Sequence, residues 1–468
     1  MSDDLPGDDT SADATSTARA GDSPADASAD RDGPAVDDLC RFIEASPSPY
    51  HAASEATRRL TDAGFTELSL GEAVPAEGDV VLRHEGFVLA WSRRGQAPAT
   101  PMRLVGAHTD SPNLRVRPRP DRVSAGWRQL GVEVYGGALL NSWLDRDLGL
   151  SGRVAIDGRA GGEPSLALRE VRWDRPLLRV PQLAIHLDRE IHTEGLTLNK
   201  QQHLSPVWGI DQRVRPGTEP GGFRGWLADE LQVDPAAILA WDLMTHDLTP
   251  PARLGQSNEL LAAPRLDNLC SSWAGVTALV EAAQSDGSGA VPVLVLSDHE
   301  EVGSTSGVGA ASGQIRRVLE DSIRAACPEP AAAEPAIAAA WAGTVVASAD
   351  MAHATHPNYV DRHEGGHLIA PGAGPAVKVN SNQRYASDAR TTALLHQAAE
   401  RAGLSLQTYS HRGDLPCGST IGPTLAASLG VGVVDLGAPQ LSMHSARELM
   451  AVPDVEPSPG CWPSWFDA

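Results

Sequence analysis

The sequence contains few cysteines and no long apolar run. Its five cysteines are scattered along the chain without any CxxC spacing, which argues against a disulfide framework and against a thiolate zinc site. No stretch of about 18 or more apolar residues occurs, and the N-terminus lacks the basic and then apolar order of a secretory signal. We therefore expect a cytoplasmic protein that does not span a membrane.

Positive charge is also scarce. The formal net charge of -22, from 38 basic and 60 acidic residues, disfavours long-range attraction to nucleic acid or to an anionic membrane. Residues 1 to 35 hold nine Asp against Arg19 and Arg31, a balance of 2 - 9 = -7, in a background of Ser, Ala, Gly and Pro. Such a segment buries too little apolar area to order itself, so we expect a disordered acidic tail over residues 1–36.

Lysine is nearly absent, since only Lys200 and Lys378 among the 38 basic residues are lysines. The guanidinium group of arginine is planar and carries several donors, whereas the ammonium group of lysine is a compact point charge. A lysine in a chain that otherwise uses arginine can mark a site that needs the ammonium group. Chance survival is the alternative interpretation.

The apolar pattern predicts an α/β fold that is interrupted by an insertion. Helices are expected from about residue 37 and over Tyr50–Ala63, followed by a hairpin of strands Val80–Leu82 and Phe87–Trp91 and by a strand Met102–Ala107. Residues 116–248 show short alternating apolar segments, among them Gln182–Leu187, and predict a β-rich insertion between two catalytic parts, 37–115 and 249–468.

After the insertion, helical and strand patterns alternate, which is typical of a three-layer α/β sandwich. The expected helices and strands are Ala274–Ala283, Val291–Leu296, Ile315–Ala326, Thr344–Ser348, Thr391–Ala402 and Val431–Leu436. The Ala/Pro/Glu stretch Pro328–Pro335 is expected to be a surface loop.

Polar side chains that can bind metals follow the expected strands or begin a helix. They are His108, Asp110, Asp267, Glu300, Glu301, Asp350 and His444. Ligands of an open α/β sheet bind at the strand ends, so we expect these side chains to converge. Each alone has a structural interpretation as a solvated acidic turn, an N-cap or a packed core histidine, and their joint placement favours a metal site.

Histidines and carboxylates without cysteine suit a pair of divalent ions, with Zn²⁺ favoured and Mn²⁺ or Co²⁺ as alternatives. One carboxylate must bridge the ions, and a shared water would be the nucleophile of a hydrolase. Of the adjacent Glu300 and Glu301, one would bind metal and the other would act as general base. Asp110 would orient the imidazole of a metal-bound His108.

Seven segments of the chain carry a family resemblance. They are residues 48–51 (SPYH), 106–113 (GAHTDSPN), 266–268 (LDN), 298–304 (DHEEVGS), 349–354 (ADMAHA), 378–386 (KVNSNQRYA) and 443–445 (MHS). Together they resemble the M18 aspartyl aminopeptidases, within the clan of dinuclear metallo-aminopeptidases. The resemblance runs from about Phe42 to the C-terminus and leaves out only the acidic tail.

The resemblance implies a role for each residue of the site. His108 and Asp350 would hold one metal, Glu301 and His444 would hold the other, and Asp267 would bridge both. Glu300 would be the general base, and Asp110 would support His108. In this family an inserted-domain histidine, matched here by His186, reaches the active site of a neighbouring subunit and stabilises the oxyanion. The family forms a tetrahedral dodecamer built from dimers, so the insertion is expected to mediate dimerisation.

The implied activity is removal of N-terminal Asp, and less readily Glu, from peptides. A net-acidic protein needs a local cation to accept such substrates, and Lys378 is the candidate, with a packing role as the alternative. Two other functions stay open, a dinuclear aminopeptidase of neutral or broad specificity and a non-catalytic assembly or cargo protein.

Two further features have more than one interpretation. His353, His356, His363 and His367 could bind an extra metal, line a substrate entrance or form a subunit contact. Cys417 could be mistaken for a nucleophile, and beside a metal centre we expect it to be a small packing residue.

Overall fold

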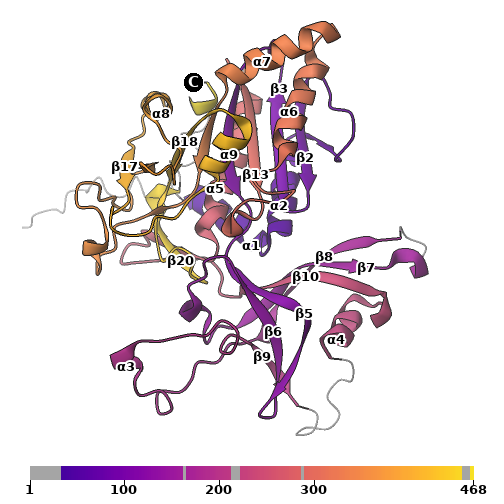
Figure 1. The fold of residues 1–468 in the computed structure, drawn as a ribbon, viewed down its shortest axis with the longest axis vertical. Coiled ribbons are helices and arrows are strands. Elements are labelled where there is room, and N and C mark those ends of the chain that lie inside the picture. Colours follow the sequence, from indigo (N-terminus) through magenta and orange to yellow (C-terminus); the bar gives the residue numbers. More distant parts are fainter. Residues whose placement is uncertain (1–32, 162–164, 212–221, 286–288, 456–463, 468) are drawn as a thin grey trace, which may run out of the picture.

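The computed structural model describes residues 33–161, 165–211, 222–285, 289–455 and 464–467. Figure 1 shows an upper α/β part and a lower β-rich part. Among the described residues, no helix is long and apolar enough to cross a membrane. Most of the predicted tail lies outside the described residues. Helix α1 (Gly33–Ala45) nevertheless begins before residue 37, because Val36 already packs into the core.

The upper part is built on a nine-stranded sheet. Its strands, in spatial order, are β1 (Thr66–Leu68), β2 (Gly78–His84), β3 (Phe87–Arg93), β13 (Val291–Ser297), β4 (Met102–His108), β14 (Val345–Ala349), β18 (Gly432–Gly437), β16 (Ala376–Val379) and β17 (Gln407–Ser410). Strands β13, β4, β14 and β18 run parallel, so their carboxyl ends share one edge. Strands β2 and β3 form the predicted hairpin.

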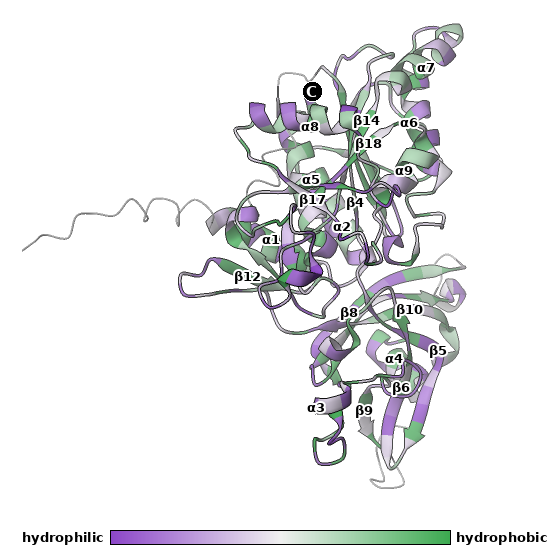
Figure 2. Cartoon of the chain, turned by 60° about the vertical axis from the view of Figure 1, so that its left-hand side comes forward, coloured by the Kyte–Doolittle hydropathy of each residue, from purple (hydrophilic) through white to green (hydrophobic). Residues whose placement is uncertain are grey.

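Helices cover both faces of this sheet, as the sequence predicts for a three-layer sandwich. Alternate residues of each strand point to opposite faces. Val105 and Ala107 of β4 pack in one core with α1, α2 (Pro49–Asp62), α5 (Leu266–Gln284) and α8 (Ala389–Arg401). Met102 and Leu104 pack in the other core with α6 (Gly313–Ala326), α7 (Ala333–Gly343) and α9 (Ile421–Leu429). Figure 2 shows the apolar strands between these helices.

One loop prediction is wrong from residue 330 onward. Residues 328–335 were expected to form a surface loop, but a 3-10 turn covers Pro330–Ala332 and α7 begins at Ala333. The alanine-rich sequence of α7 favours a helix, and Ile337 and Trp341 anchor it to the core.

The lower part is an antiparallel six-stranded sheet with a core of its own. In spatial order its strands are β8 (Ala167–Leu178), β7 (Leu148–Ile156), β10 (Ile238–Asp247), β5 (Asn113–Ser124), β6 (Trp127–Tyr135) and β9 (Val207–Ile210). Helix α4 (Gly222–Leu231) packs on it through Phe223 and Leu227. Residues 182–187, which have a strand-like pattern, form an exposed loop and turn before α3 (Ile191–Glu194), and no strand among the described residues pairs with them.

A third, five-stranded sheet adjoins the upper part. Its strands are β11 (Ala252–Leu254), β12 (Leu260–Ala263), β20 (Glu448–Ala451), β19 (Pro439–Leu441) and β15 (Ala352–His353). This sheet places the segment 442–447, which connects β19 and β20, beside the start of α5, where Asp267 lies.

Candidate metal centre

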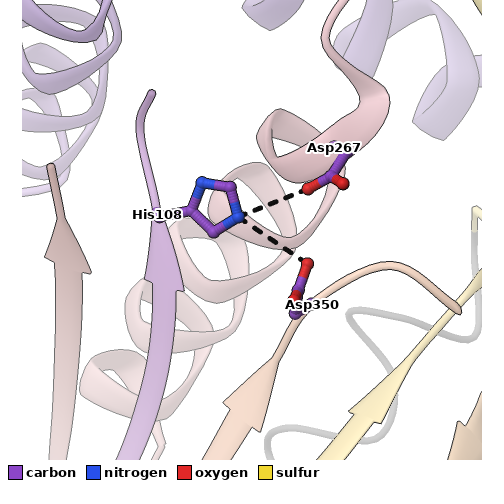
Figure 3. A group of neighbouring side chains, drawn as sticks. All are labelled: His108, Asp267 and Asp350. Carbon is purple, nitrogen blue, oxygen red and sulfur yellow. Dashed lines mark ion pairs between the residues drawn. The ribbon is translucent and has the colours of Figure 1, made fainter. Parts of the chain in front are cut away.

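The carboxyl edge of the central strands brings three predicted ligands together. His108 ends β4, Asp350 directly follows β14, and Asp267 lies in the first turn of α5. His108 Nε2 is 3.3 Å from Asp267 Oδ1 and 3.7 Å from Asp350 Oδ1 (Figure 3). All three side chains are buried, so this edge of the sheet concentrates charge away from water.

A second group of ligands lies on the other side of Asp267. Glu301 stands in the 3-10 turn Glu300–Val302 just after β13, and His444 follows β19. His444 Nε2 is 3.5 Å from Asp267 Oδ2 and 3.5 Å from Glu301 Oε1. Each oxygen of Asp267 therefore faces a different histidine, and Asp267 belongs to both groups of candidate ligands.

The donor set fits zinc. In each group the candidate ligand atoms lie within 4.8 Å of one another. Within the described part of the chain, the buried atoms Asp267 Oδ1 and Glu301 Oε1 accept no hydrogen bond. A buried carboxylate oxygen without a donor is costly unless a cation compensates it. Imidazole and carboxylate are ligands that zinc accepts.

Hydrogen bonds set the orientation of both imidazoles. His108 Nδ1 lies 3.0 Å from the backbone oxygen of Asp110, and His444 Nδ1 lies 3.2 Å from that of Gly137. Because a carbonyl oxygen can only accept, each Nδ1 carries the proton and donates it. The Nε2 atoms therefore face the carboxylates, as metal coordination requires.

The electrostatics of the site reflect its crowded acids. Burial lowers the pKa of His444, but Asp267 and Glu301 outweigh burial and raise it to about 10. Burial raises the pKa of Glu300 to about 8, with His108 acting against the shift and Asp350 adding to it. The site thus holds protons that bound cations would displace.

Asp110 anchors the turn that carries the two glutamates. Its carboxylate accepts the backbone N–H groups of Glu300 and Glu301, both at 3.1 Å, and the hydroxyl of Tyr135 at 2.7 Å. Burial would raise the pKa of Asp110, but His108 and these donors lower it below its ordinary value. In the described part of the chain, the Glu300 carboxylate itself makes no ion pair within 4.0 Å.

Sequence reasoning missed several residues that support the ligands. Glu448 accepts the backbone N–H groups of Asp267 at 2.9 Å and His444 at 2.7 Å. Tyr135, which ends β6 of the lower sheet, contacts Asp110, and Gly137, which follows this strand, contacts His444. In the sequence, the adjacent glycines after β6 indicate only a turn. No motif around Glu448 indicates that it supports the metal centre.

Lys378 and His186 lie in different surroundings. Lys378 is 2% exposed, donates to the Met351 carbonyl at 2.8 Å and lies 3.6 Å from Asp350 Oδ2. It is thus beside a predicted metal ligand, and its role in substrate selection stays a prediction. His186 lies in the exposed turn before α3, which projects from the lower part (Figure 1), and contributes to neither ligand group of its own chain.

The remaining histidines form no additional cluster with metal-site spacing in the described ranges. The backbone N–H of His356 donates to His363 Nε2 at 3.0 Å, and His367 pairs with Glu364. Neither candidate metal group includes any of them or His353. Cys417 packs against the cluster that contains Tyr385 and Tyr409.

Comparisons with known proteins point to a family of zinc metalloproteases. A family model described as the aminopeptidase I zinc metalloprotease family (M18) matches residues 42–466. A probable M18 family aminopeptidase 2 of Streptomyces avermitilis is 49% identical over 423 residues, which cover 90% of this chain and 94% of the relative.

Solved structures share the fold. A cryo-EM structure of the Ape4 and Nbr1 complex matches with a TM-score of 0.87 and 32% identity, covering 94% of this chain and 87% of that one. The S. cerevisiae mApe1 dodecamer matches with a TM-score of 0.79 and 26% identity, covering 93% and 97%. The resemblance to the M18 family is confirmed, and the chain belongs to the M18 family of zinc metallo-aminopeptidases.

Proposed function

We propose that this aminopeptidase removes N-terminal Asp, and less readily Glu, from peptides at a dinuclear centre. The observation that carries the proposal is the pair of ligand groups joined through Asp267. His108 and Asp350 would hold one zinc ion, and Glu301 and His444 would hold the other. Asp267 would contribute to both ions. Mn²⁺ and Co²⁺ are alternatives to zinc. When bound, such ions polarise the scissile carbonyl and lower the pKa of a shared water.

The chain's own residues then handle the proton and orient the groups. Glu300 accepts the proton of the attacking water at its carboxylate and returns it to the leaving amine. The Glu300 carboxylate can take this proton because it makes no ion pair with any described residue. Asp110 holds the turn of Glu300 in place through the backbone N–H, and His186 of a second copy donates to the developing oxyanion.

Selectivity for acidic residues would come from Lys378. A protein of net charge -22 repels an acidic peptide unless a local cation offsets that field. Lys378 supplies an ammonium group 3.6 Å from Asp350 and so next to the reacting bond. The proposal requires that the substrate carboxylate approach this buried ammonium.

We also propose that the inserted domain, residues 116–248, mediates dimerisation, and that dimers assemble into a dodecamer. Leu183, Ile185 and Leu187 flank His186 and are 56%, 46% and 75% exposed. Such a run of exposed apolar side chains favours burial against another chain. The similarity to the mApe1 dodecamer supports the same assembly. A cytoplasmic location stays a prediction.

The test measures zinc content and the hydrolysis of Asp-anilide, Glu-anilide and Leu-anilide, before and after chelation. We expect about two zinc ions per chain, a preference for Asp-anilide, and loss of activity that added zinc restores. Activity that survives complete chelation would contradict the metal mechanism. Equal rates on all three substrates would favour the broad-specificity alternative, and a zinc-loaded but inactive protein would favour the non-catalytic one.

A further inference from the structure

We propose that the segment Tyr135-Gly136-Gly137, which ends β6 and begins the connection to β7 within the inserted domain, positions both halves of the metal centre. The inference rests on the proposed function, because it gives this segment a role in holding the proposed ligands. The inserted domain would then be a structural component of each chain's own active site, in addition to any role in assembly.

Tyr135 acts on the half that contains His108. Its hydroxyl donates to Asp110 Oδ2 at 2.7 Å, and the same carboxylate accepts the N–H groups of Glu300 and Glu301. The Tyr135 ring is held in turn by Arg115 of β5, whose guanidinium carbon lies 3.8 Å from the ring centroid. The hydroxyl is thus a fixed donor that orients Asp110, and through it the turn with the general base.

The two glycines act on the half that contains His444. The Gly137 carbonyl accepts from His444 Nδ1 at 3.2 Å, and the backbone N–H of Leu139 donates to the His444 carbonyl at 3.0 Å. A Cβ on Gly137 would lie 3.0 Å from His444 Nδ1. A Cβ on Gly136, whose φ is +71°, would lie 3.1 Å from Glu301 Cβ. A Cβ at either position would therefore push against a candidate ligand side chain by a few tenths of an ångström, and at Gly136 the positive φ also favours glycine.

The first test replaces Tyr135 by phenylalanine, which keeps the ring and removes the donor. We expect the zinc dissociation constant, measured by competition with a chromogenic chelator, to rise about 10-fold or more, as for other residues that orient metal ligands. The kcat on Asp-anilide should fall while KM changes less than about 2-fold, because Tyr135 touches a positioning group and no substrate. Tyr50→Phe is the matched control, since Tyr50 is another buried tyrosine beneath an arginine, Arg153, at 4.4 Å.

The second test replaces Gly137 by alanine, with Gly131→Ala, within the preceding strand β6, as control. A Cβ on Gly131 meets its nearest neighbours at 3.5 Å and 3.6 Å, which is ordinary contact. We expect Gly137→Ala to weaken zinc binding about 10-fold and to alter the visible absorption spectrum of the cobalt-loaded protein. Gly131→Ala should bind zinc and absorb like the wild type.

The outcomes separate this inference from the proposed function. Wild-type protein that neither binds zinc nor hydrolyses the anilide contradicts the proposed function itself. If the wild type is active, zinc affinities of Tyr135→Phe and Gly137→Ala equal to the wild-type value overturn the positioning role alone. Losses of the same size in the two controls also overturn it, because they indicate general destabilisation.

Discussion

Replacing Glu300 by glutamine isolates proton transfer from metal binding. The change keeps the size of the side chain and the backbone N–H bond to Asp110, and removes only the ability to take a proton. Because the carboxylate makes no ion pair in the described residues, we expect zinc content and KM to stay within about 2-fold. The kcat should fall roughly 10²- to 10⁴-fold, or about 3 to 5 kcal/mol in the barrier.

The Glu300→Gln variant should also change how the folding stability of the metal-free protein depends on pH. Burial raises the pKa of Glu300 to about 8 from the ordinary value of 4.5. The folded state therefore keeps a proton that the unfolded state has lost, and folding stability falls as pH rises through this window. Glutamine removes that dependence, so the metal-free variant should gain in Tm over the metal-free wild type from about pH 4 toward pH 8.

The assay measures initial rates on Asp-anilide and zinc content in the same samples, and calorimetric Tm after chelation. Glu281→Gln is the matched control, because Glu281 lies on α5 away from both ligand groups. Activity within about 10-fold of the wild type at equal zinc content would refute the role of Glu300 as base. If the loss of activity instead matches a loss of bound zinc, Glu300 is itself a metal ligand, and its assignment as a base that does not bind metal is wrong.

Three further variants test other parts of the reasoning. Lys378→Met should reduce kcat/KM for Asp-anilide far more than for Leu-anilide; equal losses would indicate instead that Lys378 holds Asp350 in place. His186→Ala should leave Tm unchanged, because the side chain is exposed, and should lower kcat; an unchanged kcat would contradict its role in a neighbouring site. Leu294→Ala, in the fully buried centre of β13, should cost about 2 to 5 kcal/mol in the free energy of unfolding, seen in denaturant titrations, with kcat per folded molecule unchanged.

The sequence could predict the ligands because strand ends are local features. The β13 sequence VPVLVLS is buried throughout and reads as a central strand, and the acids directly follow it. The same holds for His108 after β4 and Asp350 after β14. Parallel strands place such residues at one edge. Asp267 on α5 and His444 after β19 join them through contacts that the pattern of the central strands does not give.

The supporting residues could not be predicted because their roles depend on contacts between distant elements. Glu448 lies within β20, and it reaches Asp267 only because β12 pairs with β20 and leads into α5. Tyr135 reads as an ordinary residue of an alternating strand. The loop at 182–187 differs from its strand-like pattern for a related reason, since its apolar side chains alternate but no strand in the described part of the chain pairs with them.

Strand register links the inserted sheet to the metal centre. The chain leaves β4 at His108, passes Asp110 and enters β5 at Asn113, and the antiparallel register pairs Asn113 with Tyr135. That pairing returns the end of β6 to the point where β5 began, so the Tyr135 hydroxyl meets Asp110. A slip of one residue would turn Tyr135 to the opposite face of the sheet and leave Asp110 without this donor. The same pairing therefore fixes the hairpin of the inserted domain and the orientation of the acid behind His108.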